Sequence, residues 1–245
     1  MKVLFTVISF KNNDSNNYLI ATKKLAKEII SLTPHDILIT TNEKAFFNDI
    51  ISDRIKVRDT IDPELKISLN SEFNYNSKYE AFLDLPKDYD IIFYVDGDIK
   101  LKHWDDKSDE YLNNIFSTYE YGATRLNAVL STHYENLKTS GNDLFKHKFL
   151  GHDLIDINEN DPILNSKLPS EHFLIFKNSE KVNLFAKNWK AMCFYLQNKN
   201  EFYGTLCDGF EIGICVTRAN ITEIKDISHG DSVLILGLDF NGNKI

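Results

Sequence analysis

Short apolar blocks and longer amphipathic blocks alternate along the first half of the chain. Apolar runs rich in β-branched and aromatic residues predict strands, and the run before Asp96 is apolar throughout, as in a strand buried on both faces. The predicted strands cover residues 2–9, 37–39, 55–57 and 91–95. Apolar residues three or four positions apart predict helices over residues 18–32, 43–51 and 77–85, the last with capping-box spacing between Ser77 and Glu80. Strands that alternate with helices are typical of parallel βαβ units.

The second half of the chain is less regular. We expect helices over residues 109–119, 180–196 and 208–216, and strands over residues 121–125, 174–176, 221–227 and 233–236. Residues 127–170 show little periodicity and carry many Asn, Asp and His residues, which is typical of a functional loop region. No repeat or linker-like segment interrupts the chain, so we predict an α/β fold in a single domain over residues 1–245.

Composition and charge narrow the classes of partner. The chain has 245 residues, of which 42% are hydrophobic and 26% are charged, as in ordinary globular proteins. Its net charge of −8 argues against nucleic acid or an anionic membrane as the main partner. The three cysteines, Cys193, Cys207 and Cys215, have no Cys-x-x-Cys spacing, and we expect reduced, mostly buried thiols.

The first ten residues combine a lysine with an apolar run, a combination that signal peptides also show. They contain no small-residue cleavage site and lead directly into a polar segment, so a first β-strand is the better interpretation. No apolar stretch has the length of a transmembrane helix. We therefore expect a cytoplasmic protein without a membrane span.

The strand predicted over residues 91–95 ends in Asp96, Gly97 and Asp98. Side chains alternate along an extended chain, so the two carboxylates would project to the same side, while the glycine lets the backbone turn. Two adjacent carboxylates form half of a site for a hard divalent cation, and such a cation usually holds phosphate. The alternative is that these residues only end the strand, because all of them favour turns.

Ligands of open α/β sheets collect beyond the carboxyl ends of the strands, so the residues there are candidates for a binding site. Ser9 and Asn42, with Thr6 in the same first segment, offer short hydrogen-bonding side chains suited to a base or ribose. Phe10 offers a ring on which a base could stack. Polar residues at strand ends are also common in solvated turns, so each of these assignments has a structural alternative.

This organisation resembles that of GT-A-type glycosyltransferases, which use nucleotide sugars. The resemblance covers residues 1–125, where βα units lead to an apolar strand that ends in Asp-x-Asp, and it extends more loosely to residues 172–230. It implies a GT-A-like, Rossmann-like α/β/α domain with a mixed, mostly parallel central sheet. It also implies a nucleotide-binding half over residues 1–125 and an acceptor and catalytic half over residues 126–245.

The resemblance assigns the acidic motif to a metal site. In such enzymes the second aspartate typically binds Mn²⁺ or Mg²⁺, which implies that Asp98 is the metal ligand. The first aspartate contacts the ribose or the metal, which implies one of these contacts for Asp96, with Gly97 beside it in the nucleotide-sugar site. The metal bridges the diphosphate, which is the leaving group of the reaction. Because this group leaves as a dianion, the site has to hold positive charge next to it before the glycosyl bond breaks. Several relatives add a histidine near the C-terminus, for which the candidate here is His229, with Asp231 as the fallback. The longer His-Gly-Lys signature of some relatives is missing, and a surface role for this histidine stays open.

Further site residues follow from the same resemblance. Lys78 matches a lysine that often approaches the donor, although an exposed helix position would suit it too. Glu171 and His172 come directly before a predicted strand and could line the sugar pocket. Asp208 and Glu211 would share a helix face and correspond to acidic residues that contact the transferred sugar or the acceptor. One of them would be the general base of an inverting reaction, whereas a retaining reaction, which the metal site favours, needs none. Asp208 also suits a helix N-cap.

We therefore expect a metal-dependent hexosyltransferase that moves a sugar from a nucleotide diphosphate sugar, in the first instance a UDP-sugar, to a glycan or glycosylated acceptor. A non-catalytic protein of the same fold, which binds nucleotide or glycan without turnover, is one alternative. A haloacid-dehalogenase-like phosphatase is another, because it also has an apolar strand followed by Asp-x-Asp. Such phosphatases usually carry the motif in the first strand, with Thr or Val two residues later, where this chain has Lys100.

Overall fold

A mixed seven-stranded sheet forms the centre of the protein, in the order β3-β2-β1-β4-β7-β6-β8. The computed structural model describes residues 1–11, 16–50, 52–61, 74–126, 129–132, 162–170, 172–198 and 208–240, with side chains for all of these except 74–76, 194–198, 208 and 210. Within these residues, β7 is antiparallel to both neighbours, and every other neighbouring pair is parallel. The strands are β1 (Val3–Ser9), β2 (Asp36–Thr41), β3 (Ile55–Asp59), β4 (Ile91–Val95), β6 (Tyr121–Ala123), β7 (Phe173–Lys177) and β8 (Ile224–Asp226).

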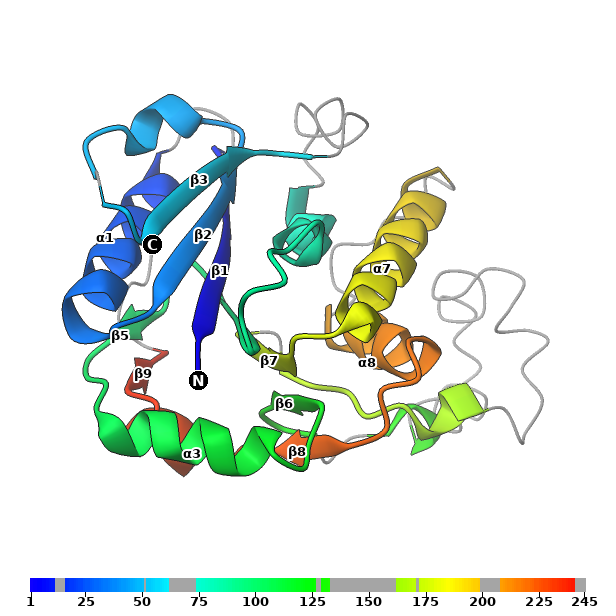
Figure 1. Cartoon of the computed structure of the whole chain (residues 1–245). Helices are drawn as coiled ribbons and strands as arrows, with labels where there is room; N and C mark the ends of the chain where they lie inside the picture. The colour runs from blue at the N-terminus through cyan, green and yellow to red at the C-terminus, as the bar shows by residue number, and fades with distance from the viewer. Residues whose placement is uncertain are drawn as a thin grey trace.

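Helices cover both faces of this sheet (Figure 1). One face carries α1 (Asn17–Leu32) and α3 (Asp106–Phe116), and the other carries η2 (Asn74–Phe82), α7 (Glu180–Asn198) and α8 (Asp208–Arg218). The remaining elements are short: η1 (Lys44–Phe47), η3 (Pro162–Asn165), α9 (His229–Leu234) and a separate two-stranded sheet of β5 (Lys100–Leu101) and β9 (Leu238–Asp239).

Alternating side chains of β1 explain why two layers of helices are needed. Leu4 and Ile8 lie in the hydrophobic core that includes η2, α7 and α8, whereas Phe5 and Val7 lie in the core that includes α1 and α3. Every residue of β1 is buried, which is the pattern of a strand covered on both faces. The predicted α/β/α arrangement with a mostly parallel sheet is therefore confirmed.

Three predicted elements differ from the structure. The helix expected over 43–51 is only the single 3₁₀ turn of η1, and the one expected over 77–85 is a 3₁₀ helix that already begins at residue 74. Glu80 is buried and accepts a hydrogen bond from the Ile61 amide at 2.9 Å, so its carboxylate makes a tertiary contact. The strand expected over 233–236 is wrong, because Ser228 caps a helix, α9, by accepting a hydrogen bond from the Asp231 amide.

Two further expectations concern the thiols and the membrane. Cys193 and Cys215 are buried thiols, as predicted, and Cys207 lies outside the described residues. Among the described residues, no helix combines the length and the hydropathy that a bilayer-spanning segment requires.

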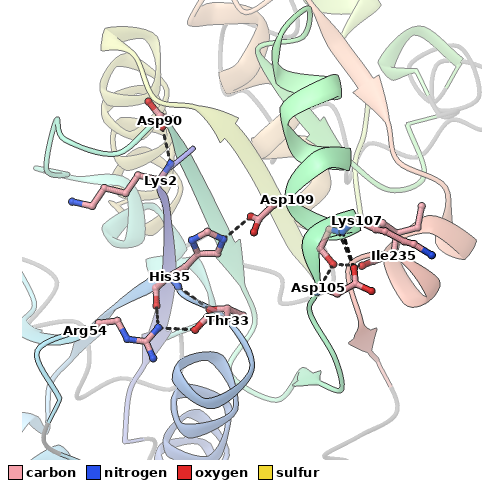
Figure 2. Close-up of polar contacts among 10 residues, drawn as sticks. Lys2, Thr33, His35, Arg54, Asp90, Asp105, Lys107, Asp109 and Ile235 are labelled. Atoms are coloured by element: carbon pink, nitrogen blue, oxygen red, sulfur yellow. Dashed lines mark hydrogen bonds and ion pairs between the residues drawn. The ribbon is translucent and has the colours of Figure 1, made fainter.

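Polar side chains at the amino edge of the sheet make structural contacts, as Figure 2 shows. The imidazole of His35, directly before β2, lies 2.8 Å from the Asp109 carboxylate of α3. Arg54, directly before β3, donates to the backbone carbonyl of His35 at 3.2 Å. The Lys2 amide, directly before β1, donates to the Asp90 carboxylate at 2.7 Å. These contacts hold neighbouring elements together.

Candidate active site

The candidate site lies at the carboxyl edge of the sheet, where β4 ends in the Asp-Gly-Asp segment. The reversed direction of β7 brings the start of that strand to the same edge, with Val95 paired to Phe173. The Asp96 amide donates to the His172 carbonyl at 3.0 Å, so these two residues, far apart in sequence, are neighbours. A parallel β7 would have placed His172 at the opposite edge.

The Asp-Gly-Asp segment is a turn that packs closely against α1. The Ile99 amide donates to the Asp96 carbonyl at 3.0 Å, so strand alternation ends at Asp96 and does not determine the direction of Asp98. A Cβ atom at Gly97 would overlap the Thr22 hydroxyl and lie 3.2 Å from Cε1 of Tyr18. Glycine is therefore required here by the close approach of the helix, whereas the sequence suggested only a need for turning.

Asp96 is buried and bound by three side chains. Its carboxylate accepts a hydrogen bond from the Tyr94 hydroxyl at 2.6 Å and lies 3.2 Å from the Lys78 ammonium. The Nδ1 atom of His172 lies 3.7 Å from its other oxygen. Burial alone would raise the pKa of Asp96, but Lys78, His172 and Tyr94 together hold it below its ordinary value. These three side chains thus compensate the buried negative charge of Asp96, and one of them, Lys78, comes from the middle of η2.

The pKa of Asp98 is shifted in the opposite direction to that of Asp96. Burial is the main cause that raises its pKa, and the neighbouring Asp96 carboxylate adds to the effect. The same surroundings act on Tyr18 of α1, whose phenol pKa is raised by burial and then by Asp96. A carboxylate that is partly buried beside a second carboxylate is a place where a cation would be stabilised.

His229 is connected to this cluster through Phe240. His229 is exposed at the start of α9, and its ring centroid lies 5.2 Å from that of Phe240. The ring of Phe240 in turn lies 5.7 Å from the ring of His172, which contacts Asp96. Three residues that sequence reasoning assigned to one site therefore lie along a continuous chain of side-chain contacts.

The donor set agrees in chemistry with Mn²⁺ or Mg²⁺, since carboxylates suit both ions and an imidazole suits Mn²⁺. Within the described part of the chain, no three His, Cys, Asp or Glu side chains lie close enough together to hold a metal ion. Asp96 contacts Lys78, Tyr94 and His172, so of the two carboxylates of the turn Asp98 is the better candidate for a metal ligand. Ions that bridge a diphosphate are commonly held by one or two carboxylates, phosphate oxygens and water, so a carboxylate such as Asp98 would be compatible with such an ion.

The other strand-end candidates have different surroundings. Thr6 is buried within β1, not beyond its end, and Phe10 is buried in the core, so neither presents its side chain at the edge. Ser9 is the last residue of β1, and its buried hydroxyl has no hydrogen-bond partner among the described residues. Asn42 is exposed after β2 and accepts a hydrogen bond from the Lys11 amide at 2.9 Å, which joins the ends of β1 and β2.

The predicted acidic pair lies on α8, which begins at Asp208. Glu211 is buried, and its carboxylate accepts a hydrogen bond from the Trp189 indole of α7 at 2.9 Å. A Cβ atom at Gly209 would overlap the Pro169 carbonyl, so the first turn of α8 packs against the segment that leads to His172. The Asp208 side chain and all of Glu171 lie outside the described part.

Sequence reasoning missed the residues that hold the acidic turn in place. Tyr94 could have been found, because it lies two positions before Asp96 on the same side of the strand. Tyr18 and Thr22 were recognised only as part of a helix, and nothing in the sequence indicated that α1 would pack on Gly97. Phe240 gave no signal at all.

A cavity of about 740 Å³ lies elsewhere, between the end of η2 and the start of α7. Its lining includes Lys87, Asn178 and Leu184. Asn178 follows Lys177, which pairs with the first residue of β4, so this cavity is at the amino edge of the sheet. It is therefore separate from the Asp-Gly-Asp turn.

Comparison with known proteins identifies the fold. No family model matches the sequence, and no curated protein does. The crystal structure of mouse xyloside xylosyltransferase 1, in its apo form, is similar over 100% of both chains, with a TM-score of 0.53 at 12% sequence identity. The chain has a GT-A-type glycosyltransferase fold.

Two further glycosyltransferase structures are similar to this GT-A-type chain. The galactosyltransferase LgtC, in complex with donor and acceptor sugar analogues, matches with a TM-score of 0.46 at 13% identity, over 91% of this chain and 72% of that one. The mannosyltransferase Ktr4p from S. cerevisiae matches with a TM-score of 0.48 at 12% identity, over 93% of this chain and 68% of that one. The fold rests on the likeness to the xylosyltransferase, and at 12% identity activity has to be argued from the site.

Proposed function

We propose that this protein is a metal-dependent glycosyltransferase that moves a sugar from a UDP-sugar to a glycan or glycosylated acceptor in the cytoplasm. The observation that carries the proposal is the contrast between the two aspartates of the turn. Asp96 is compensated by Lys78, His172 and Tyr94, which hold its pKa below the ordinary value, whereas burial and the Asp96 carboxylate keep the pKa of Asp98 raised although its own backbone, His172 and Lys78 partly oppose the effect. This contrast occurs at the sheet edge where α/β folds bind nucleotides, in a fold shared with a xylosyltransferase.

The chemistry requires the anomeric carbon to part from a diphosphate oxygen and to bond to an acceptor oxygen, whose proton is released. Mn²⁺ or Mg²⁺, held by Asp98 with His229, would supply positive charge against the leaving diphosphate. The residues of the chain have separate tasks. Asp96 orients Lys78 and His172 at the edge, and Gly97 allows α1 to close tightly over the turn. The side chain of His172 is 49% exposed, so it can meet a bound donor.

We favour retaining chemistry, because Glu211, the acidic side chain of the pair that the structure describes, does not suit the role of a general base. An inverting enzyme needs a general base that can reach the acceptor hydroxyl. Of the two acidic residues proposed for that task, Glu211 is 2% exposed and bonded to the Trp189 indole. Its carboxylate therefore joins α7 to α8 and is not presented to an acceptor.

Substitution of Glu211 tests this assignment. Glu211→Gln keeps an oxygen that can accept the Trp189 hydrogen bond, so we expect it to retain transfer activity within about threefold while Glu211→Ala lowers the stability by about 1–3 kcal/mol. Activity is measured as UDP release, and stability by urea denaturation. A loss of about 100-fold or more in Glu211→Gln, with unchanged stability, would be typical of a general base and would contradict the structural role.

A thermal-shift panel tests the proposed function itself. UDP-glucose, UDP-galactose, UDP-xylose and GDP-mannose are each added with and without Mn²⁺, because a ligand that binds the native state raises the melting temperature. At about 100 times its Kd, the correct donor should stabilise the protein by about 2.7 kcal/mol, and only when Mn²⁺ is present. UDP-xylose is included because the mouse protein of similar fold is a xylosyltransferase.

The outcomes separate the alternatives. Metal-dependent stabilisation followed by UDP release with an acceptor supports the transferase. Stabilisation without any turnover of the donor would indicate a binding protein of the same fold. A phosphatase would instead hydrolyse p-nitrophenyl phosphate through a nucleophilic first aspartate, a role that does not suit Asp96 with three side chains bound to it. No response to any nucleotide sugar would contradict the proposal.

A further inference from the structure

The C-terminal strand β9 is fixed to the segment that directly follows the Asp-Gly-Asp turn. Lys100 pairs with Asp239, and the Lys102 amide donates to the Gly237 carbonyl at 2.8 Å. The Lys102 ammonium also lies 2.8 Å from the Asp239 carboxylate. Gly237 has a φ of +66°, and a Cβ atom there would overlap the His103 carbonyl, so close packing holds this strand in register.

Phe240 follows β9 and is surrounded by three aromatic rings. Its ring centroid lies 5.7 Å from that of His172, 5.2 Å from that of His229 and 6.1 Å from that of Phe173. The two histidines come from different parts of the chain, one directly before β7 and the other at the start of α9. Phe240 thus contacts both histidines.

His172 already forms an ion pair with Asp96, so the contact with Phe240 matters most for the imidazole of His229. His172 and His229 are both exposed, and no hydrogen bond from another residue fixes the ring of His229 among the described contacts. An exposed imidazole can occupy several rotamers, and its contribution to a site depends on the fraction of time that it spends in the correct one. Contact with a ring held by a paired strand reduces that freedom.

We infer that Phe240 is a positioning residue whose ring holds the imidazoles of His172 and His229 beside the Asp-Gly-Asp turn. The contacts themselves stand without any assignment of function, whereas the consequence for metal binding rests on the proposed function. The alternative is that Phe240 only fills the edge of the hydrophobic core, to which Phe173 belongs. In that case an aliphatic side chain of similar size would serve equally well.

Nuclear magnetic resonance of the imidazole Cε1 protons tests the contacts in the full-length protein without metal. The two signals are assigned from His172→Gln and His229→Gln, and the ring current of Phe240 acts on both. Phe240→Leu keeps the apolar bulk and removes the ring, so both signals should move while that of His103 stays. Phe240→Tyr should restore the wild-type positions. Phe46→Leu is the matched control, because Phe46 is half-buried on η1 and its ring packs on Phe47.

Titration of the same samples with Mn²⁺ tests the consequence. The ion broadens signals near its site, and Phe240→Leu should need about tenfold more Mn²⁺ for the same broadening, in the range typical of residues that orient a ligand. Phe240→Tyr should remain within about twofold of the wild type if the aromatic ring is what matters.

The results are decisive in both directions. The inference would be overturned if the histidine signals of Phe240→Leu kept their wild-type positions, or if Phe46→Leu shifted them equally. It would also be overturned if the wild type bound Mn²⁺ and Phe240→Leu needed no more of the ion than the wild type. If Mn²⁺ broadens neither histidine in the wild type, the proposed metal site fails, and the movement of the two signals in Phe240→Leu still establishes or refutes the positioning contact.

Discussion

At Gly97 the chain passes so close to α1 that an added methyl group would overlap a side chain of the helix. We predict that Gly97→Ala destabilises the protein by about 1–3 kcal/mol, since the added Cβ would overlap the Thr22 hydroxyl. That hydroxyl is buried with no hydrogen-bond partner among the described residues, so Thr22→Ala can relieve the overlap. Urea denaturation of the two single variants and the double variant measures the coupling.

The cost of Gly97→Ala should fall by about 1 kcal/mol or more in the Thr22→Ala background. Additive effects of the two substitutions would show that the overlap does not limit this position. The result matters for the site, because displacement of Gly97 would also displace Asp96 and Asp98 on either side of it.

His35 gives a second prediction at the scale of a residue. Burial lowers the pKa of this imidazole, and the Asp109 carboxylate only partly opposes the effect. A histidine whose pKa is lower in the folded state favours folding above its unfolded value of about 6.5, and that contribution is lost as the pH falls below this value. The wild type should therefore lose stability between pH 7 and pH 5, by at most about 1.4 kcal/mol per pH unit from this group.

Comparison of the wild type with His35→Gln isolates the contribution. The variant should be less stable at pH 7, and the difference between the two proteins should shrink as the pH is lowered to 5. Guanidinium denaturation at several pH values measures it. A difference that stays constant, or grows, over this range would contradict the lowered pKa.

At the scale of elements, Arg54 connects the end of α1 to the start of β3. Its guanidinium donates to the backbone carbonyls of Ile30 and Thr33 (2.6 Å) at the end of the helix and to that of His35 (3.2 Å) beyond it. The last carbonyls of a helix have no partner within the helix. We predict that Arg54→Ala costs about 2 kcal/mol in the free energy of unfolding. Lys24→Ala, at an exposed position on the same helix, should cost less than about 0.5 kcal/mol. Equal effects of the two substitutions would show that the cap adds no stability.

The strands and long helices could be predicted from the sequence because their patterns are local. The apolar runs before Ser9 and Asp96 and the periodic stretch before Pro34 each report burial directly. The 3₁₀ helix η2 could not be predicted, because Arg58 of β3 fixes its end by donating to the carbonyls of Glu80 and Leu83 at 2.6 and 2.7 Å. Such a contact depends on tertiary structure.

In the candidate site, too, the features with a local sequence signal could be predicted and those that depend on tertiary contacts could not. Asp96 and Asp98 were found because they end a buried strand, which is a local signal. Their unequal environments come from Lys78 and His172, which only the folded sheet brings to them. The contact of Glu211 with the Trp189 indole could not be predicted, because spacing on a helix shows which residues share a face but not what that face contacts.

At the scale of the whole molecule, one reversed strand assembles the site. β7 runs against its neighbours, and the loop before it therefore meets the end of β4. β6 and β8 run parallel to each other, so the segment after β8, with His229, leaves the sheet at that same edge. The ends of β4 and β8 and the start of β7 thus lie at one edge of the sheet, and open α/β sheets bind their ligands beyond the carboxyl ends of the strands.

Calorimetric titration of UDP into the protein, with and without Mn²⁺, tests the central claim most directly. The wild type should bind UDP only with Mn²⁺, and Asp98→Asn should fold normally but bind at least roughly 100-fold more weakly, beyond the usual effect of a supporting residue. Asp106→Asn, at an exposed position on α3, is the matched control and should bind as the wild type does. Wild-type UDP affinity in Asp98→Asn with Mn²⁺ present would contradict the account.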